Sequence, residues 1–168
     1  MGLYNSRSSN EPEAKHLLTT PSTYVSTFKK YLLIRPSNMD EQVDKLFINF
    51  HKTDQARFGY NIYSSKNVMF WDVIAEDEQR NFCYHKLIEK QSFNHVLILI
   101  TPHVTVREVL EHAQLTYLKV PAIILAEHHS INNKLTKDVI TYTESYKIPY
   151  HEINTNDIED LLQILTIY

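Results

Sequence analysis

The chain has 168 residues, of which 43% are apolar and 22% are charged, a balance that predicts one globular domain with a substantial core. The 17 basic and 20 acidic side chains leave a net charge of −3, so no positive field drives the protein onto nucleic acid or anionic lipid. Only 2 residues are glycine, against an average share of roughly 7%. This scarcity excludes the loops GxGxxG and GxxxxGK[ST], which hold phosphates with backbone N–H groups.

The first residues carry a lipidation pattern. The run Met1-Gly2-Leu3-Tyr4-Asn5-Ser6 fits M-G-x-x-x-[ST], the pattern for N-myristoylation of Gly2. A single myristoyl chain binds membranes weakly and needs a second signal, and residues 1–28 contain no cysteine that could carry palmitate. We expect a cytoplasmic protein that Gly2 holds weakly at a membrane face with help from a protein partner. The alternative is an unmodified initiator segment.

The remaining sequence predicts an alternating fold. Residues 1–27 are polar and lack periodicity, which is typical of a flexible arm, and residues 28–168 are expected to form one domain. The elements predicted in chain order are a strand at 31–34, a helix at 40–51, a strand at 68–73, a helix at 77–90, a strand at 95–101, a helix at 105–117, a strand at 121–126, a helix at 134–146, a strand at 149–153 and a helix at 157–167. This order predicts a three-layer α/β/α fold with a mainly parallel sheet.

Several stretches resemble the Ras-like small GTPases. The run Phe70-Trp71-Asp72-Val73-Ile74-Ala75-Glu76 is similar to the WDTAGQE stretch of that family. The resemblance places Asp72 at the aspartate of the magnesium shell. It places Ala75 at the glycine that senses the γ-phosphate, and Glu76 at the glutamine that orients the attacking water. Of the family's residues, this stretch keeps the tryptophan and the aspartate.

The last third of the chain resembles the same family. Residues 120–125 are similar to the strand that leads into the guanine-reading NKxD motif, and residues 148–160 to the last strand, base loop and final helix. The NKxD positions fall on Glu127, His128, His129 and Ser130, and those of the SAK triplet on Asn154, Thr155 and Asn156. None of these positions carries the family's residue.

The phosphate-binding segment departs furthest from the family. The place of the phosphate loop is taken by residues 35–42, which contain neither glycine nor lysine. Pro36 lacks an N–H group, and Asp40 with Glu41 brings negative charge to the place where phosphates would lie. We also expect the segment between the first helix and Trp71 to be too short for a full first switch and its hairpin.

The resemblance covers about residues 30–168 and implies a P-loop GTPase-like topology that lacks the phosphate loop. We therefore predict a pseudo-GTPase that neither binds nor hydrolyses GTP, has no cofactor or small-molecule substrate, and is not an enzyme. We expect it to act as a scaffold in a multi-subunit complex, through a partner surface around residues 72–83. The degenerate nucleotide positions are Asp72, Ala75, Glu76, Glu127, Ser130 and Asn154.

Three alternatives remain open. The stretch around Glu108 resembles nucleoside deoxyribosyltransferases, whose glutamate attacks the sugar carbon, although that family's aspartate and glycines are missing from the loop; a solvated glutamate near a helix start is the plainer interpretation. Glu127 with His128 and His129 could ligate a metal, but adjacent histidines point in different directions and no third ligand stands at helical spacing. A noncognate mode of nucleotide binding would need Asp72 to hold magnesium.

The chain has a single cysteine, Cys83, which we interpret as a packing residue.

Overall fold

The protein is described by a computed structural model that covers residues 28–75, 77–100, 120–127 and 133–168. The strands are β1 (Lys29–Ile34), β2 (His51–Gln55), β3 (Tyr60–Ser65), β4 (Val68–Val73), β5 (His95–Ile100), β6 (Ala122–Glu127) and β7 (Tyr150–Ile153). The α-helices are α1 (Asp40–Leu46), α2 (Asp77–Lys90), α4 (Asn133–Tyr146) and α5 (Ile158–Leu165), and the 3-10 turns are η1 (Ser37–Met39) and η2 (Ala56–Phe58). The predicted arm at 1–27 and the predicted helix at 105–117 lie outside the described residues.

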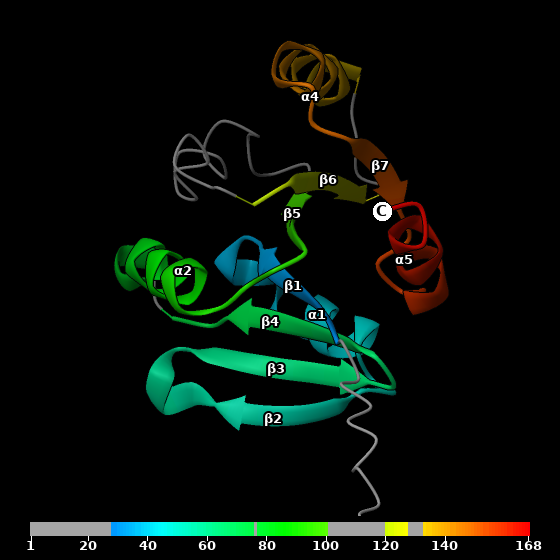
Figure 1. The fold of residues 1–168 in the computed structure, drawn as a ribbon. Coiled ribbons are helices and arrows are strands. Elements are labelled where there is room, and N and C mark those ends of the chain that lie inside the picture. Colours follow the sequence, from blue (N-terminus) through cyan, green and yellow to red (C-terminus); the bar gives the residue numbers. More distant parts are fainter. Residues whose placement is uncertain (1–27, 76, 101–119, 128–132) are drawn as a thin grey trace, which may run out of the picture.

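The strands form one seven-stranded sheet in the order β2-β3-β4-β1-β5-β6-β7 (Figure 1). The five strands from β4 to β7 in this order are parallel to their neighbours, and β2 and β3 add an antiparallel edge. The central strands β1, β5 and β6 are nearly continuous apolar runs, because a parallel sheet that is covered on both faces buries every side chain.

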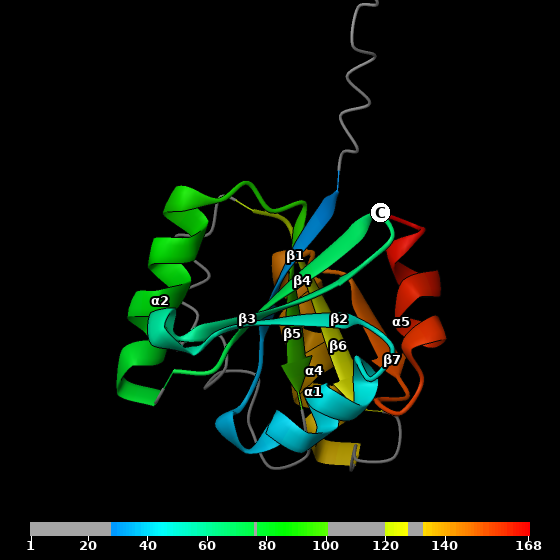
Figure 2. The same ribbon diagram turned by 90° about the horizontal axis from the view of Figure 1, so that it is seen from below.

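Each face of the sheet has its own apolar core. On one face, Leu32 and Ile34 of β1 pack in a cluster that includes Leu87 of α2 and Val139 of α4. On the other face, the alternate residues of β1 pack in a cluster with side chains of α1 and α5. Figure 2 shows α2 and α5 on opposite sides of the sheet. The predicted three-layer arrangement and the mainly parallel sheet are therefore confirmed.

The first helix is shorter than predicted. It ends at Leu46 instead of residue 51, and residues 47–50 form a turn closed by a 2.9 Å bond from the Phe50 N–H to the Phe47 carbonyl. Phe47 is nevertheless buried, with Phe50 packed edge-on against it and Phe70 in contact with both rings. Phe47 and Phe50 thus reach the core from a turn. The helical spacing of apolar residues continues through this turn, and for that reason the sequence predicts a longer helix than the structure contains.

The expectation that the segment before Trp71 is too short for a hairpin is wrong. Strand β3 pairs antiparallel with β4 over six residue pairs, and β2 adds a further antiparallel strand outside it. The turn between β2 and β3 depends on Gly59, whose φ is +78°. A Cβ at this position would lie 3.1 Å from Cys83 Sγ and 3.3 Å from Ala75 Cβ. One of the two glycines is therefore needed for a turn that packs against α2 and the end of β4.

The antiparallel edge is tied to α1 by a polar cluster. The carboxylate of Asp44 accepts hydrogen bonds from Lys52 Nζ at 2.7 Å and from Tyr63 Oη at 2.6 Å. These two bonds lower the pKa of Asp44, and the bond from Lys52 has the larger effect. The Phe47 ring stacks on the Tyr63 ring with a centroid distance of 4.8 Å.

No helix in the described part of the chain is both long and apolar enough to span a membrane.

Asp44→Asn tests this tie through the pH dependence of stability. Because the folded-state pKa of Asp44 is lowered, its contribution to stability is present above the unfolded value of about 3.9 and is lost as pH falls through the folded value. Urea unfolding across the acid range should show a shallower loss of stability in the variant than in the parent chain. Glu144→Gln, at an exposed position of α4, is the control and should keep the parental slope. An unchanged slope in Asp44→Asn would contradict this account of the tie.

Candidate functional site

The carboxyl ends of the parallel strands lie together at one end of the sheet, where open α/β sheets form their binding sites. In this protein a buried ion pair occupies that end. Arg35 follows β1, and Asp72 lies near the end of β4. The Nε and Nη2 atoms of Arg35 donate to Oδ1 and Oδ2 of Asp72 at 2.7 and 2.9 Å. Both side chains are only 1% exposed. Leu33 and Asp72 are register partners, so a side chain two residues further along β1, on the same face, reaches the carboxylate directly.

The same guanidinium organises the turn that leads into α1. Its Nη2 atom also donates to Asp40 Oδ1 at 2.6 Å, and its Nη1 atom donates to the Pro36 carbonyl at 3.1 Å. From the other side, Arg80 Nη1 of α2 donates to the Arg35 carbonyl at 3.0 Å. Residues 35–39 alone connect β1 to α1, and the Arg35 side chain lies bonded to both ends of that connection.

The charges in this cluster hold one another in place. Burial raises the pKa of Asp72, and the hydrogen bonds and charge of Arg35 oppose that rise. Burial has the opposite effect on Arg35 and lowers its pKa. The interactions of Arg35 with Asp72, and then with Asp40, outweigh this effect of burial and raise the pKa above its ordinary value. Because both oxygens of Asp72 accept an N–H at short range, the geometry is that of a carboxylate paired with a guanidinium.

The second part of the predicted nucleotide site is assembled from β6 and β7. Glu127 ends β6, and its Oε1 atom accepts a 2.9 Å hydrogen bond from Thr155 Oγ1. Asn154 turns inward on its own loop, because its Oδ1 atom accepts from the Asn156 N–H and its N–H donates to Asp160 Oδ2, both at 3.0 Å. The structure thus brings Glu127 next to the loop that follows β7, and the polar groups of this loop bond to one another, to Glu127 and to Asp160 in the first turn of α5.

Other predicted residues do not enter a described site. Ala75 is half-buried and packs under Gly59. Gly2, Glu76, Glu108, His128, His129 and Ser130 lie outside the described residues. Within the parts of the chain that the structure describes, no group of three or more His, Cys, Asp or Glu side chains is placed to hold a metal.

Sequence reasoning missed the role of the two buried arginines. Arg35 was counted only as a part of a loop without glycine, and Arg80 was not singled out. A signal for Arg80 is present in the sequence, since it precedes Tyr84 and Leu87 by four and seven positions on α2. A charged residue on the apolar stripe of a helix indicates a buried polar partner. Arg80, Tyr84 and Leu87 are all buried.

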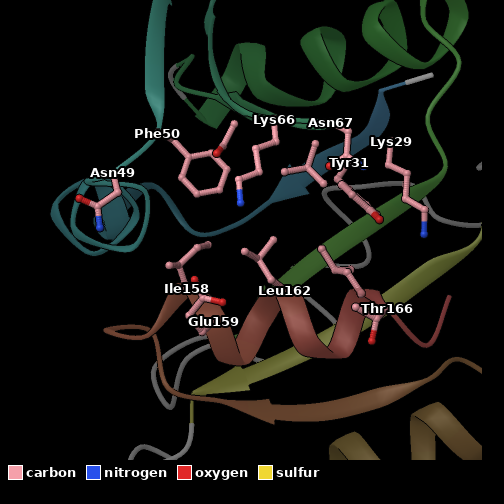
Figure 3. Close-up of a pocket in the computed structure, with 13 residues that line it drawn as sticks. Lys29, Tyr31, Asn49, Phe50, Lys66, Asn67, Ile158, Glu159, Leu162 and Thr166 are labelled. Carbon is pink, nitrogen blue, oxygen red and sulfur yellow. The ribbon is translucent and has the colours of Figure 1, made fainter. Parts of the chain in front are cut away.

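The described residues line two hollows that lie away from the ion pair. One, of about 400 Å³, lies between α5, the start of β1 and the turn from β3 to β4. In Figure 3 the side chains of Ile158 and Leu162 point from α5 towards Phe50 across this space. The other, of about 460 Å³, lies between α2 and the turn that carries Phe58, and its lining is mostly aromatic on the sheet side. Neither hollow was predicted from the sequence.

Comparison with known proteins identifies the fold. No protein-family model and no curated protein matches the chain. The chain is similar in structure to translation elongation factor SelB from Methanococcus maripaludis, solved with the GTP analogue GPPNHP. That match has a TM-score of 0.55 and 12% identity over 83% of this chain and 33% of that one. The G-domain of FeoB from Methanococcus jannaschii matches with a TM-score of 0.52 and 11% identity, over 83% of this chain and 96% of that domain. The chain therefore spans about a third of SelB, and it has a GTPase-like fold.

The ion pair can be tested with a double-mutant cycle. Arg35→Met leaves the Asp72 carboxylate buried without its partner and should destabilise the protein by about 3–5 kcal/mol. Adding Asp72→Leu removes the orphaned charge and should restore most of that loss. Denaturant unfolding of the four proteins measures the cycle, and Lys45→Met, an exposed cation on α1, controls for loss of a surface charge. Equal and additive losses would contradict a coupled pair.

The same variant predicts a pH effect with a definite sign. In Arg35→Met, the hydrogen bonds and the charge of Arg35 no longer lower the pKa of Asp72, and the charge of Arg80 alone opposes burial, so this pKa rises further. A carboxyl whose folded pKa lies above its unfolded pKa contributes stability at low pH that is lost as pH rises through the folded value. The deficit of Arg35→Met should therefore grow with pH, and a deficit that shrinks with pH would refute the assignment.

Proposed function

We propose that this chain is a GTPase-like domain that neither binds nor hydrolyses GTP and acts as an interaction or assembly subunit. The observation that supports the proposal most is the Arg35 guanidinium on Asp72. In the family that the sequence resembles, the aspartate at this position belongs to the magnesium shell. Here both of its oxygens accept N–H groups of Arg35, so a cation from the protein itself lies where magnesium would bind, and a second cation at this carboxylate would be repelled by the guanidinium.

The connection from β1 to α1 supports the absence of phosphate binding. A phosphate loop offers a row of backbone N–H groups at a helix N-terminus, whereas this connection has no glycine and includes Pro36. The first turn of α1 carries Asp40 and Glu41. These carboxylates themselves interact favourably with the positive N-terminal end of the helix dipole, and their negative charge repels a phosphate. Of the two arginines at this place, Arg35 is already paired with two carboxylates, and Arg80 donates to the Arg35 carbonyl.

Nucleotide binding by the full chain is the direct test of this proposal. A nucleotide present at a hundredfold excess over its Kd would stabilise the protein by about 2.7 kcal/mol, which a melting experiment detects. Because we propose that no nucleotide binds, millimolar Mg·GTP or Mg·GDP should give no rise in Tm and no saturable heat in calorimetry. Arg35→Ser, which releases Asp72, should also bind no nucleotide, because the backbone cradle for phosphates is still missing. Nucleotide that copurifies with the protein, or micromolar binding by either form, would contradict the proposal.

We further propose that Gly2 is myristoylated and adds weak membrane attachment to the protein contacts. The support is the M-G-x-x-x-[ST] pattern at residues 1–6. Co-expression with N-myristoyltransferase and intact-mass measurement should show an acylated chain, and Gly2→Ala should remove the acyl group. The acylated form should sediment with vesicles only partly, because one chain binds reversibly. An unmodified mass for the parent chain would end this part of the proposal.

A further inference from the structure

A groove of about 460 Å³ separates α2 from the antiparallel edge of the sheet. Phe58, Tyr60 and Trp71 line its sheet side, and their rings follow one another with centroid distances of 6.3 and 4.9 Å. Its helix side is lined by Phe82, Cys83, Lys86, Leu87, Lys90 and Gln91. These positions repeat every four residues over two turns of α2, so the stripe runs about 12 Å along the helix.

Two aromatic side chains of this groove are left largely in solvent. Phe58 is 53% exposed and Phe82 is 64% exposed, although each could bury roughly 150–250 Å². Single exposed apolar residues are ordinary on protein surfaces. These two instead line one groove with an aromatic floor. Large aromatics around a preformed hollow are the side chains that contribute most to protein interfaces.

The rim of the groove is positively charged in a protein of net negative charge. Lys86 and Lys90 stand one helical turn apart, and among the described residues no carboxylate lines the groove. The Arg57 guanidinium lies 4.6 Å from the centre of the Phe58 ring, and Lys86 Nζ lies 5.5 Å from that of Phe82. Lys86 also pairs with Glu89 at 3.4 Å, with both groups in solvent. Exposed pairs of this kind contribute little stability, so Lys86 can turn to an incoming carboxylate.

We propose that this groove binds the apolar face of an amphipathic helix whose flanks carry Asp and Glu. The inference rests on the proposed interaction role and names the chemistry of the partner. A straight stripe on α2 accepts a helix through anchors at i, i+3, i+4 and i+7. Apolar anchors cover Phe58 and Phe82 while acidic flanks meet Arg57, Lys86 and Lys90. The charges select the partner and speed its association, and the aromatic contacts supply most of the affinity.

The test is a displayed library of amphipathic helices with one fixed apolar face and flanking positions randomised among Glu, Lys, Gln and Ser. Selection on the full-length protein should enrich Glu at the flanks. Phe58→Ser and Phe82→Ser, both at exposed positions, should weaken the selected helices by about tenfold or more. Ile48→Ser is the matched control, because Ile48 is 76% exposed and follows α1 on the opposite face of the sheet; it should leave binding unchanged. Lys86→Glu with Lys90→Glu should reverse the preference towards Lys.

Cys83 gives an independent readout. It is a free, partly buried thiol that lines the groove, so a bound helix should slow its alkylation several-fold. Selected helices with basic flanks, helices that still bind both serine variants, or a selection that yields no binder would each overturn the inference. These results are distinct from failure of the proposed nucleotide independence, because Mg·GTP binding would leave the flank preference and the Cys83 protection unaffected.

Discussion

The ion pair between Arg35 and Asp72 joins the ends of two central strands in a place where water does not reach. One guanidinium bonds to both carboxylate oxygens, to Asp40 on α1 and to the Pro36 carbonyl. Arg80 adds a bond from α2 to the backbone of Arg35. Elements on both faces of the sheet are therefore positioned against one arginine. A buried pair of this kind adds little net stability over an apolar replacement, but the loss of one partner is costly, so its main effect is to fix one arrangement of this edge.

The arrangement also accounts for the lack of glycine in the connection from β1 to α1. A loop that wraps an anion with backbone N–H groups needs glycine, whereas a turn organised by a side chain at its centre does not. Residues 35–39 pass from β1 to α1 beside the Arg35 side chain, whose guanidinium donates to the Pro36 carbonyl, while the Arg35 carbonyl accepts from Arg80. The described glycine stands elsewhere, at Gly59, where a positive φ and close contact with Cys83 demand it.

Much of the fold follows from the sequence, because its buried strands are continuous apolar runs and its long helices are bounded by clear polar breaks. The helix at 77–90 and the strand at 68–73 were predicted with the bounds observed. Strand β2 was missed because none of its side chains is fully buried, so it has no apolar pattern. Asp72 was identified through a resemblance, but the role of Arg35 depends on the register that sets Leu33 opposite Asp72, and a single sequence does not specify strand register.

The central claim is that the Arg35 guanidinium permanently occupies the ligand positions of Asp72. Nuclear magnetic resonance of the Arg35 Nε–H group, assigned with Arg35→Lys, measures this directly. The account predicts a signal that is protected from solvent exchange without any ligand and that stays unchanged, with the backbone signals of residues 35–40, when Mg·GTP is added to millimolar concentration. A rapidly exchanging Nε–H, or saturable shifts of these signals with nucleotide, would contradict it.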